Sequence, residues 1–590
     1  MGDMIAEDSR LVVRLDGMSL PSKQLIGGKA WSIARMRALG LPVPPAFVIT
    51  TEACRYYMHS GRSQDGLLDQ AMEGIRYLEK IVNRCFGAEQ RPLLVSVRSG
   101  APVSMPGMMD TVLNLGINDV TERALAAENG NEVFARDSHR RFLELYARIV
   151  LRATVQALPH EGSPTKWREL IAAAGNGAVP DSPIEQLDAA IHAVFDSWNS
   201  RRAKKYRAHH GIADDMGTAV TVQAMVFGNG DEHSGTGVLL SRNPLTGENE
   251  VYGEYLAQAQ GEDVVSGSHT PEPLEKLSDL MPALHAQLLS AAATLENENG
   301  DVQDIEFTVE RGKLYLLQSR DAKRAPPAAV RIAVDKVAAG QWRVEQALTR
   351  VSAEQVRTIL RPRLVNDADL ANARAIAQGE AASPGVGVGI VATSADEAEK
   401  LAARGQRVIL MRPTTSPEDV HGMLVAEGVI TERGGSTSHA AVVSRQLGVP
   451  CVVGCGDGAL SDLAGKMVTV DGASGKVYAG SLPVEHPDED SDPALKQLRI
   501  WAVAHSPVRV LRVGHGIPPD SADLDAMAGG DDVANTRELL RGRRGAVGAV
   551  LNTDEGVRAA LDARVEFIVV RHELPALLAA CAANAERINA

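Results

Sequence analysis

The apolar positions near the N-terminus predict a helix followed by a strand. Gly27-Gly28-Lys29 opens a helical pattern that runs to Leu39, and Gly40 follows it as the expected cap. Ala46–Thr50 is a short apolar run of the kind that forms strands. The chain therefore begins with an α/β pattern.

From about residue 118 to 215 the apolar positions recur with helical spacing. The clearest helix begins after Ser182, with Pro183 at its first position and Glu185 completing a capping box. A basic run, Arg201–Arg207, lies at the expected end of this helix, where cations complement the helix dipole, so a solvated face is favoured over nucleic-acid binding. One face is predicted to carry Ile184, Leu187, Ile191, Val194, Phe195 and Trp198.

Short apolar runs broken by Gly, Asn and Pro return at residues 218–255 and 302–320, which predicts strands. Lys323–Pro327 marks a boundary, and a helical connector follows to about Gly379. The first part of the chain is thus expected to be an α+β domain with a helical insertion.

The rest of the chain divides at an acidic, proline-flanked stretch, residues 485–493, which is expected to stay extended and solvated. After it, apolar runs at 508–513, 546–551 and 565–570 alternate with helical patterns and predict a small βα unit. The chain is therefore predicted to be multidomain, α/β and α+β. The expected divisions are an α+β domain at 1–335 with a helical insertion at about 118–215, a helical linker at 336–380, an α/β domain at 381–483, an acidic linker at 484–493 and a βα region of unknown role at 494–590.

Length and charge narrow the class of protein. The chain has 590 residues, 44% of them hydrophobic, so it can fill several cores. Its 61 basic and 75 acidic residues give a net charge of −14, which disfavours nucleic acid and anionic membranes as partners. Because no apolar run approaches ~20 residues and the N-terminus is acidic, we expect a soluble protein that is not exported.

The five cysteines form no CxxC pair and no dense framework, which fits a reducing, cytoplasmic environment. Cys451 and Cys455 are close enough in sequence to suggest a metal site. Structural zinc needs four ligands, however, and no second cysteine pair or nearby His-rich tract supplies the others, so this interpretation is disfavoured.

His439 is the first candidate for chemistry. Gly428–Thr431 is predicted to be a buried strand, Glu432–Gly435 a turn, and Thr437–Leu447 a helix ended by Gly448. A histidine in the first turn lies where unpaired N–H groups carry roughly half a positive charge, which disfavours imidazolium and favours a phosphate. A neutral ring nitrogen would then be free to attack. We predict a phosphorylated histidine, against the alternative of one that merely packs near a helix cap.

A predicted hairpin supplies a second candidate site. Asp304 and Glu306 alternate on one face of a strand, and Gln318 and Arg320 do so on the next. A three-residue loop at Glu310–Gly312 would bring all four onto one side, whereas a two-residue loop would separate them. Oxygen ligands from Glu306 and Gln318 could then hold Mg²⁺ against nucleotide phosphates, and Arg320 could bind an anion. The alternative is an ordinary hairpin ion pair facing solvent.

Two loops add weaker signals. Three methionines surround Gly107 at residues 105–109, which fits either an adaptable cover over a ligand or simple core filling. Gly27-Gly28-Lys29 before a helix is a plausible phosphate cradle with a mobile cation, although it is not a full P-loop motif.

Together these segments resemble pyruvate phosphate dikinase in order and spacing, and the resemblance covers nearly all of residues 20–483. The related phosphoenolpyruvate synthases and antibiotic phosphotransferases are similar in outline. They usually have a different loop after Val-Arg-Ser, however, and often a cysteine directly before the histidine, where this chain has Ser438. The matching segments are Gly27–Lys29, Val97–Gly100, Ser104–Thr111, Ser241–Pro244, Val251–Tyr255, Gln260–Val265, Gln303–Thr308, Leu317–Arg320 and Gly434–His439.

The resemblance implies that residues 1–335 form an ATP-grasp nucleotide domain and 381–483 a swivelling phosphohistidine domain. It also implies a role for Thr437, two residues before His439, as a site that some family members phosphorylate to switch the enzyme off. The further roles it implies are phosphate contacts from Lys29 and Arg98, Mg²⁺ ligands from Glu306 and Gln318, support from Asp304 and Arg320, and an adenine pocket bordered by Gln223 and Met225.

The family ordinarily continues into a β/α barrel that binds pyruvate or phosphoenolpyruvate. From Ala494 onward only about 97 residues remain, against the ~250 of such a barrel, so we expect that domain to be absent. The predicted activity is that ATP and phosphate phosphorylate His439 and yield AMP and pyrophosphate, with transfer to pyruvate only if a barrel is supplied by another polypeptide. The alternatives are a phosphoenolpyruvate synthase-type or antibiotic dikinase, and a noncatalytic nucleotide-binding regulator.

Overall fold

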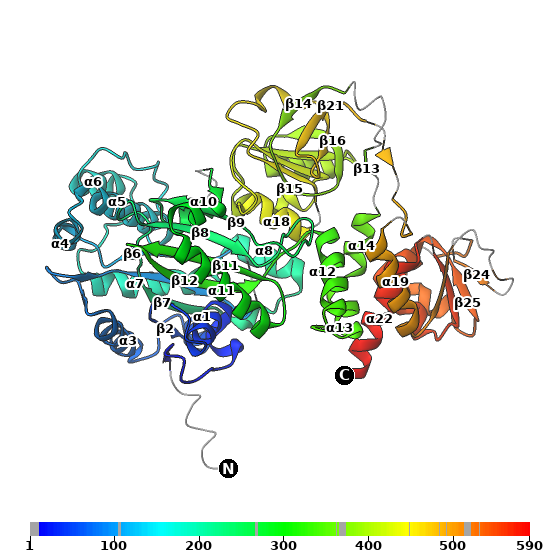
Figure 1. Ribbon diagram of the computed structural model, residues 1–590, viewed down its shortest axis with the longest axis horizontal. Coiled ribbons are helices and arrows are strands. Elements are labelled where there is room, and N and C mark those ends of the chain that lie inside the picture. Colours follow the sequence, from blue (N-terminus) through cyan, green and yellow to red (C-terminus); the bar gives the residue numbers. More distant parts are fainter. Residues whose placement is uncertain are drawn as a thin grey trace, which may run out of the picture. The chain divides into compact units, whose positions relative to one another are not determined.

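The structure is a computed structural model in which the chain forms two compact units. The first comprises Met1–Ser241, Gly253–Asp321 and Ser416–Glu418, and the second Arg242–Tyr252, Ala322–Thr415 and Asp419–Ala590. Each unit mixes helices and strands (Figure 1), which confirms a multidomain α/β class, whereas the finer domain limits stay predictions. The structure describes residues 11–589 except 104, 106–107, 266–269, 361–362, 365–372, 448, 483, 486, 491, 513–517, 519–520, 525, 530–531 and 571.

A five-stranded sheet with the order β1-β2-β7-β5-β6 lies at the centre of the first unit. In β2, Phe47 and Ile49 enter one hydrophobic core and Ala46 and Val48 enter another. The strand is therefore buried on both faces, which explains its uninterrupted apolar sequence. The strands are β1 (Val12–Arg14), β2 (Ala46–Ile49), β5 (Val95–Gly100), β6 (Thr111–Leu115) and β7 (Ala219–Ala224).

A second five-stranded sheet in this unit has the order β10-β9-β8-β11-β12. Residues of β11 and β12 share a core with helix α1 (Lys23–Ala38), which also packs on the first sheet. The hydroxyl of Ser32 in α1 donates to the carbonyl of Ser319 at 2.6 Å and accepts from its N–H at 3.0 Å, so the helix joins the two sheets. The strands are β8 (Gly235–Leu240), β9 (Tyr252–Ala257), β10 (Glu272–Pro273), β11 (Gln303–Glu310) and β12 (Lys313–Asp321).

The predicted helical insertion is present, with one correction to its apolar face and one to its basic end. Ile184, in the first turn of α7, is 43% exposed, whereas the other five apolar residues are buried. Ser200 caps a new helix, so the basic run belongs to α8 and not to the end of α7. The helices are α4 (Asp119–Asn129), α5 (Glu132–Ile149), α6 (Pro164–Ala173), α7 (Pro183–Ser197) and α8 (Arg201–His210).

The basic run is also not merely a solvated face. The side chain of Arg207 is fully buried, its guanidinium lies 4.2 Å from the centre of the Trp198 ring, and its Nε donates to Asp214 at 2.7 Å. Cation–π contact and the ion pair together stabilise the charge away from water.

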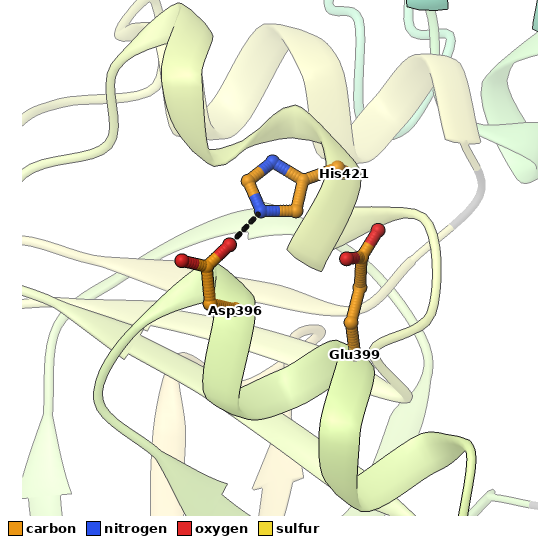
Figure 2. Close-up of side chains that lie close together, drawn as sticks. All are labelled: Asp396, Glu399 and His421. Atoms are coloured by element: carbon orange, nitrogen blue, oxygen red, sulfur yellow. Dashed lines mark hydrogen bonds and ion pairs between the residues drawn. The ribbon is translucent and has the colours of Figure 1, made fainter.

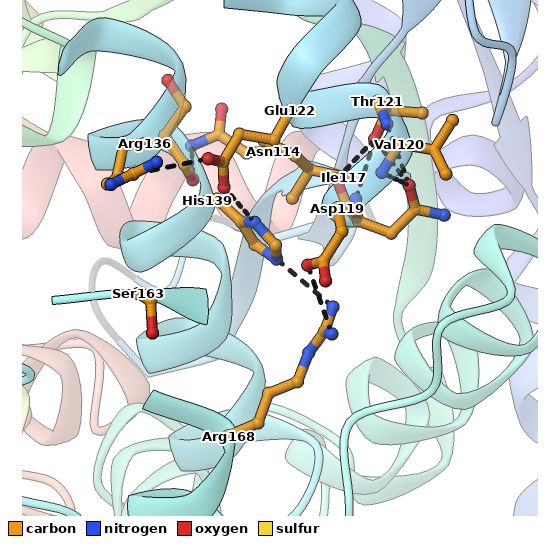
Figure 3. A network of polar contacts seen from close by, with 12 residues as sticks. Asn114, Ile117, Asp119, Val120, Thr121, Glu122, Arg136, His139, Ser163 and Arg168 are labelled. Carbon is orange, nitrogen blue, oxygen red and sulfur yellow. Dashed lines mark hydrogen bonds and ion pairs between the residues drawn. The ribbon is translucent and has the colours of Figure 1, made fainter. Parts of the chain in front are cut away.

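A buried polar network ties α4, α5 and α6 together (Figure 3). Nδ1 of His139, a fully buried residue, lies 2.6 Å from a carboxylate oxygen of Glu122, and its Nε2 lies 3.5 Å from Arg168. Arg168 in turn pairs with Asp119 at 3.3 Å. Burial alone raises the pKa of Glu122, but His139 and Arg136 outweigh it and the net shift is downward.

An eight-stranded sheet with the order β14-β21-β20-β16-β17-β18-β19-β15 dominates the second unit. Strands β16 to β19 are mutually parallel neighbours, and β18 coincides with the strand expected at residues 428–431. The strands are β14 (Ala375–Gln378), β15 (Glu380–Ser383), β16 (Val386–Ala392), β17 (Val408–Arg412), β18 (Gly428–Thr431), β19 (Cys451–Val453), β20 (Met467–Asp471) and β21 (Lys476–Ala479).

The expected connector is helical only in its first part. Helices α12 (Pro326–Ala338), α13 (Val344–Arg350) and α14 (Ala353–Ile359) pack against α19 (Pro493–His505) and α22 (Glu573–Asn589), whereas residues 375–378 form β14 of the large sheet. The tail forms the expected small βα unit, a parallel sheet with the order β23-β26-β25-β24. Its strands are β23 (Arg509–Arg512), β24 (Ser521–Asp523), β25 (Gly545–Val547) and β26 (Phe567–Val570).

The acidic stretch is not solvated throughout, which corrects the sequence prediction. Glu489 is fully buried, and its carboxylate accepts from the N–H of Leu574 at the start of α22, at 3.1 Å. Asp488 pairs with Arg512, and Asp490 with Arg499. Local composition favoured a solvated linker, but the N-terminus of α22 and the side chains of Arg499 and Arg512 hold the acidic side chains.

Replacing His139 by alanine tests the buried network. We expect the free energy of unfolding of the first unit to fall by about 2–4 kcal/mol, because Glu122 would keep its charge but lose its closest partner. Urea denaturation followed by tryptophan fluorescence would measure the change. His160→Ala is the matched control, since that side chain is 84% exposed and its loss should change stability by at most about 0.5 kcal/mol. Equal effects of the two substitutions would contradict a structural role for the network.

Candidate active site

Lys29 is positioned by a break in helix α1. Ser22 caps α1 and the helix begins at Lys23, so the glycine pair does not open the helix as expected but interrupts it. Gly27 has φ +74°, and a Cβ atom there would lie 1.9 Å from the carbonyl oxygen of Gly100, so only glycine fits. The N–H of Gly28 donates to the carbonyl of Ala101 at 2.9 Å. The break therefore lets α1 approach the end of β5 closely, and Lys29 lies at this contact.

Arg98 links the two sheets of the first unit. It lies in β5 between Thr221 of β7 and Thr111 of β6. Its Nη2 is 3.3 Å from Oε2 of Glu306 and 3.3 Å from Oε1 of Gln318, both in the other sheet. The two oxygens thus converge on the same positively charged group, the guanidinium of Arg98.

The hairpin brings its four polar groups together by a route that differs from the expected one. The turn has two residues, Arg311 and Gly312, and both have positive φ, as in a type I′ turn. Such a turn alone would put Gln318 out of phase with Glu306. A β-bulge at Leu317 restores the phase, so that Glu306 faces Gln318 across the ladder.

The same register sets Asp304 opposite Arg320, and Nε of Arg320 donates to Oδ2 of Asp304 at 2.8 Å. Asp304 raises the pKa of Arg320 above its ordinary value, so this guanidinium stays charged. The pair places a fixed cation beside the position on which Glu306 and Gln318 converge.

The charges at this site shift the pKa values of its members. Burial, together with the neighbouring Arg98, lowers the pKa of Lys29 from 10.5 to about 7, with Glu306 opposing the shift. Burial alone raises the pKa of Glu306, but Arg98, Arg320 and Lys29 outweigh it and the net shift is downward. The site therefore combines an ionised carboxylate, two permanent cations and a lysine that titrates near neutral pH.

The residues expected to border an adenine pocket lie at one end of β7. Gln223 is buried and its amide donates to the carbonyl of Pro44 at 3.2 Å, and Met225 is partly exposed. Thr221, which faces Arg98 in the ladder, was not foreseen. Its hydroxyl is buried and has no hydrogen-bond partner among the described residues. A β-branched threonine in an apolar strand gives no distinct signal in the sequence.

The methionine loop is only partly described, and Gly107 lies outside the described residues. Met105 and Met108 are buried and Met109 is partly exposed. Nε of Arg202 donates to the Met108 carbonyl at 3.1 Å, and the same guanidinium pairs with Asp110. Burial of these two side chains fits either alternative, core filling or an adaptable cover over a ligand.

His439 is the first residue of α18 (His439–Leu447) in the second unit. Ser438 caps the helix, because its carbonyl accepts from Val442 and its hydroxyl accepts from Ala441. The predicted place of the histidine in the first turn is thus confirmed, while Gly448 lies outside the described residues. Burial lowers the pKa of His439 from 6.5 to about 4, and Asp419 opposes the shift only in part.

The imidazole of His439 is held at one nitrogen. Nδ1 lies 3.2 Å from the hydroxyl of Thr415, whereas Nε2 has no hydrogen-bond partner among the described residues. If Nδ1 carries the proton and donates to Thr415, Nε2 keeps its lone pair. Thr415 was not foreseen from the sequence. The signal available was its place just after β17, which neighbours β18 in the sheet.

The loop before His439 is fixed by two charged side chains. Arg445, which is buried, donates to the carbonyls of Ser436 at 2.7 Å and Ala382 at 2.8 Å. Glu380 accepts from the N–H of Ser436 at 3.1 Å. Thr437, the predicted regulatory residue, is buried in this loop, so its modification would require the loop to open.

Segments of the chain match two known family models. Residues 23–80 and 67–287 match the AMP/ATP-binding domain of pyruvate phosphate dikinase, and residues 405–475 match the mobile domain of PEP-utilising enzymes. The chain thus combines a segment that matches a nucleotide-binding domain with one that matches a mobile domain, and His439 lies in the second segment.

The similar proteins found in other organisms are pyruvate, phosphate dikinases. A pyruvate, phosphate dikinase of Clostridium symbiosum is 41% identical over 549 residues, covering 87% of this chain and 62% of the relative. One from Rhizobium meliloti is 42% identical, covering 82% and 59%, and pyruvate, phosphate dikinase 2 of Zea mays is 43% identical, covering 80% and 57%. This chain is a pyruvate, phosphate dikinase-like protein, and it spans about six-tenths of the length of these relatives. Among the described residues, no helix is both long enough and apolar enough to cross a bilayer.

We expect Lys29, as a predicted phosphate contact, to make nucleotide binding depend on pH. Because its pKa is about 7 without a ligand, most Lys29 side chains are neutral at pH 8, and a bound polyphosphate should raise the pKa and draw in a proton. Calorimetry with a non-hydrolysable ATP analogue, in buffers of different ionisation enthalpy, should show net proton uptake at pH 8 and weaker binding as the pH rises further.

Lys29→Arg is the control, since arginine stays charged and the ligand's own titration is retained. Proton uptake at pH 8 should fall in this variant. The same uptake in both proteins would show that Lys29 does not sense the nucleotide.

Proposed function

We propose that this protein is an ATP-dependent phosphotransferase of the pyruvate, phosphate dikinase type in which His439 carries the phosphoryl group. The observation that carries the proposal is the uncharged imidazole at the start of α18, whose Nδ1 meets Thr415 and whose Nε2 has no partner among the described residues. Such a nitrogen is a ready nucleophile at neutral pH.

The first unit supplies the groups that a nucleotide needs. Lys29, Arg98 and Arg320 would bind the phosphates, and Gln223 and Met225 would border the adenine. The converging oxygens of Glu306 and Gln318 fit Mg²⁺, which prefers oxygen ligands and phosphates. When bound there, Mg²⁺ would neutralise charge on the polyphosphate.

The proposed reaction follows from charge and geometry. Nε2 of His439 forms a bond to the β-phosphorus of ATP as the bond to AMP breaks, and inorganic phosphate then takes the γ-phosphoryl group and leaves as pyrophosphate. Asp304 would keep Arg320 oriented. Positioning and charge neutralisation by these side chains would supply most of the rate enhancement.

The acceptor of the phosphoryl group is a separate part of the proposal. The relatives are named for pyruvate and phosphate, and we extend both substrates to this chain. A further domain or another polypeptide would present the pyruvate. A cytoplasmic location and control through Thr437 stay predictions.

His439→Asn tests the carrier directly. The wild-type protein, incubated with ATP and phosphate, should gain one phosphoryl group by intact mass spectrometry and release AMP and pyrophosphate. The variant should do neither but should still bind the ATP analogue. AMP formation that persists in the variant would exclude the phosphohistidine. Phosphate-independent turnover would favour a synthase-type or antibiotic dikinase, and nucleotide binding without any turnover would favour a noncatalytic regulator.

Thr415→Val tests the orientation of the ring. We expect His439 to be phosphorylated about 10- to 100-fold more slowly, with nucleotide affinity unchanged, because the substitution removes the contact at Nδ1. Quenched-flow labelling would give the rate. Thr415→Ser keeps the hydroxyl and should restore most of it, and an unchanged rate in Thr415→Val would remove this residue from the mechanism.

A further inference from the structure

A second cluster of ligating side chains lies in the second unit, apart from His439. Asp396 and Glu399 are carried by α16 (Ala395–Ala402), and His421 by α17 (Val420–Met423). The three side chains turn toward one another from the two helices (Figure 2). One ligand atom from each lies within 4.8 Å of the other two, and Nε2 of His421 is 3.0 Å from Oδ1 of Asp396.

The packing of the two helices fixes this arrangement. Asp396 and Glu399 are three residues apart, so they share one face of α16. A Cβ atom on Gly422, next to His421, would lie 2.5 Å from Cα of Ala395, so the two helices touch through a glycine. Side chains from both helices, among them Ala398 and Met423, enter the same hydrophobic core. The packing of α16 against α17 thus positions the three side chains, in addition to the contact between His421 and Asp396.

The chemistry of the three groups indicates a class of ion. One imidazole nitrogen and two carboxylate oxygens suit a borderline divalent cation such as Zn²⁺, with water completing the coordination. Mg²⁺ and Ca²⁺ prefer oxygen ligands alone, which separates this cluster from Glu306 and Gln318. Asp396 and Glu399 are exposed, so an ion can reach them.

We propose that Asp396, Glu399 and His421 form a Zn²⁺-binding site on the mobile domain. Glu399 adds a second carboxylate, which has an oxygen within 4.8 Å of the ligand atoms of the other two residues. The paired negative charges of the two carboxylates are offset when a divalent cation lies between them.

The site adjoins the segment that orients the phosphorylated residue. α17 directly follows Asp419, which pairs with Arg412 at 3.0 Å, and that segment begins at Thr415, which contacts His439. A cation that joins α16 to α17 would hold the segment in place. This consequence rests on the proposed function, whereas the site itself does not.

Zinc titration of the metal-free, 590-residue protein tests the site without any nucleotide. Isothermal calorimetry should show one Zn²⁺ site. His421→Ala, and the double variant Asp396→Asn with Glu399→Gln, should each weaken it at least ~10-fold. Circular dichroism would verify that each variant folds. His285→Ala, on α11 (Pro282–Asn299), is the matched histidine control, and Glu306→Gln is the control for the nucleotide site. Neither control should change the affinity.

Two outcomes would overturn the proposal. One is that Zn²⁺ does not bind the wild-type protein, and the other is that folded His421→Ala binds Zn²⁺ as tightly as the wild type. Because the assay contains neither ATP nor phosphate, neither outcome would bear on whether His439 is phosphorylated.

Discussion

The contact of one guanidinium with two oxygens joins the two sheets that carry the proposed nucleotide site. Arg98 comes from one sheet of the first unit, and Glu306 and Gln318 come from the other. Three basic side chains, Lys29, Arg98 and Arg320, lie beside two carboxylates there, so the site would have an excess of positive charge if all three were protonated. Such charges are costly to bury unless they are paired. The low pKa of Lys29 is one result of this cost.

Much of this site follows from the sequence, because each of its groups stands next to a recognisable strand or turn. The alternation of Asp304 with Glu306, and of Gln318 with Arg320, predicted that the four would meet. The expected three-residue loop was wrong, because the turn has two residues. A bulge at Leu317 then restores the phase between the two strands. A bulge depends on packing across the whole ladder, and no local pattern of residues encodes it.

Other errors have the same physical origin. The acidic stretch before α19 was expected to be solvated, but Glu489 is buried against a helix start 85 residues away in sequence. Arg207 was assigned to a solvated face, but Trp198 and Asp214 bury its charge. Thr415 reaches His439 only because β17 and β18 are neighbours in the sheet. Composition and periodicity describe a segment by itself, whereas these contacts depend on tertiary structure.

Burial lowers the pKa of a basic side chain in each unit, Lys29 in the first and His439 in the second. In the first unit, burial beside cations leaves Lys29 only partly charged, so an arriving polyphosphate would restore the favoured protonated state. In the second unit, burial keeps His439 neutral, and a neutral ring at a helix N-terminus has no charge to repel the partial positive charge there. Transfer of a phosphoryl group to His439 would then bring negative charge to that helix end, where the backbone N–H groups favour it. Desolvation thus lowers the pKa of both groups, so that Lys29 is only partly charged and His439 is neutral.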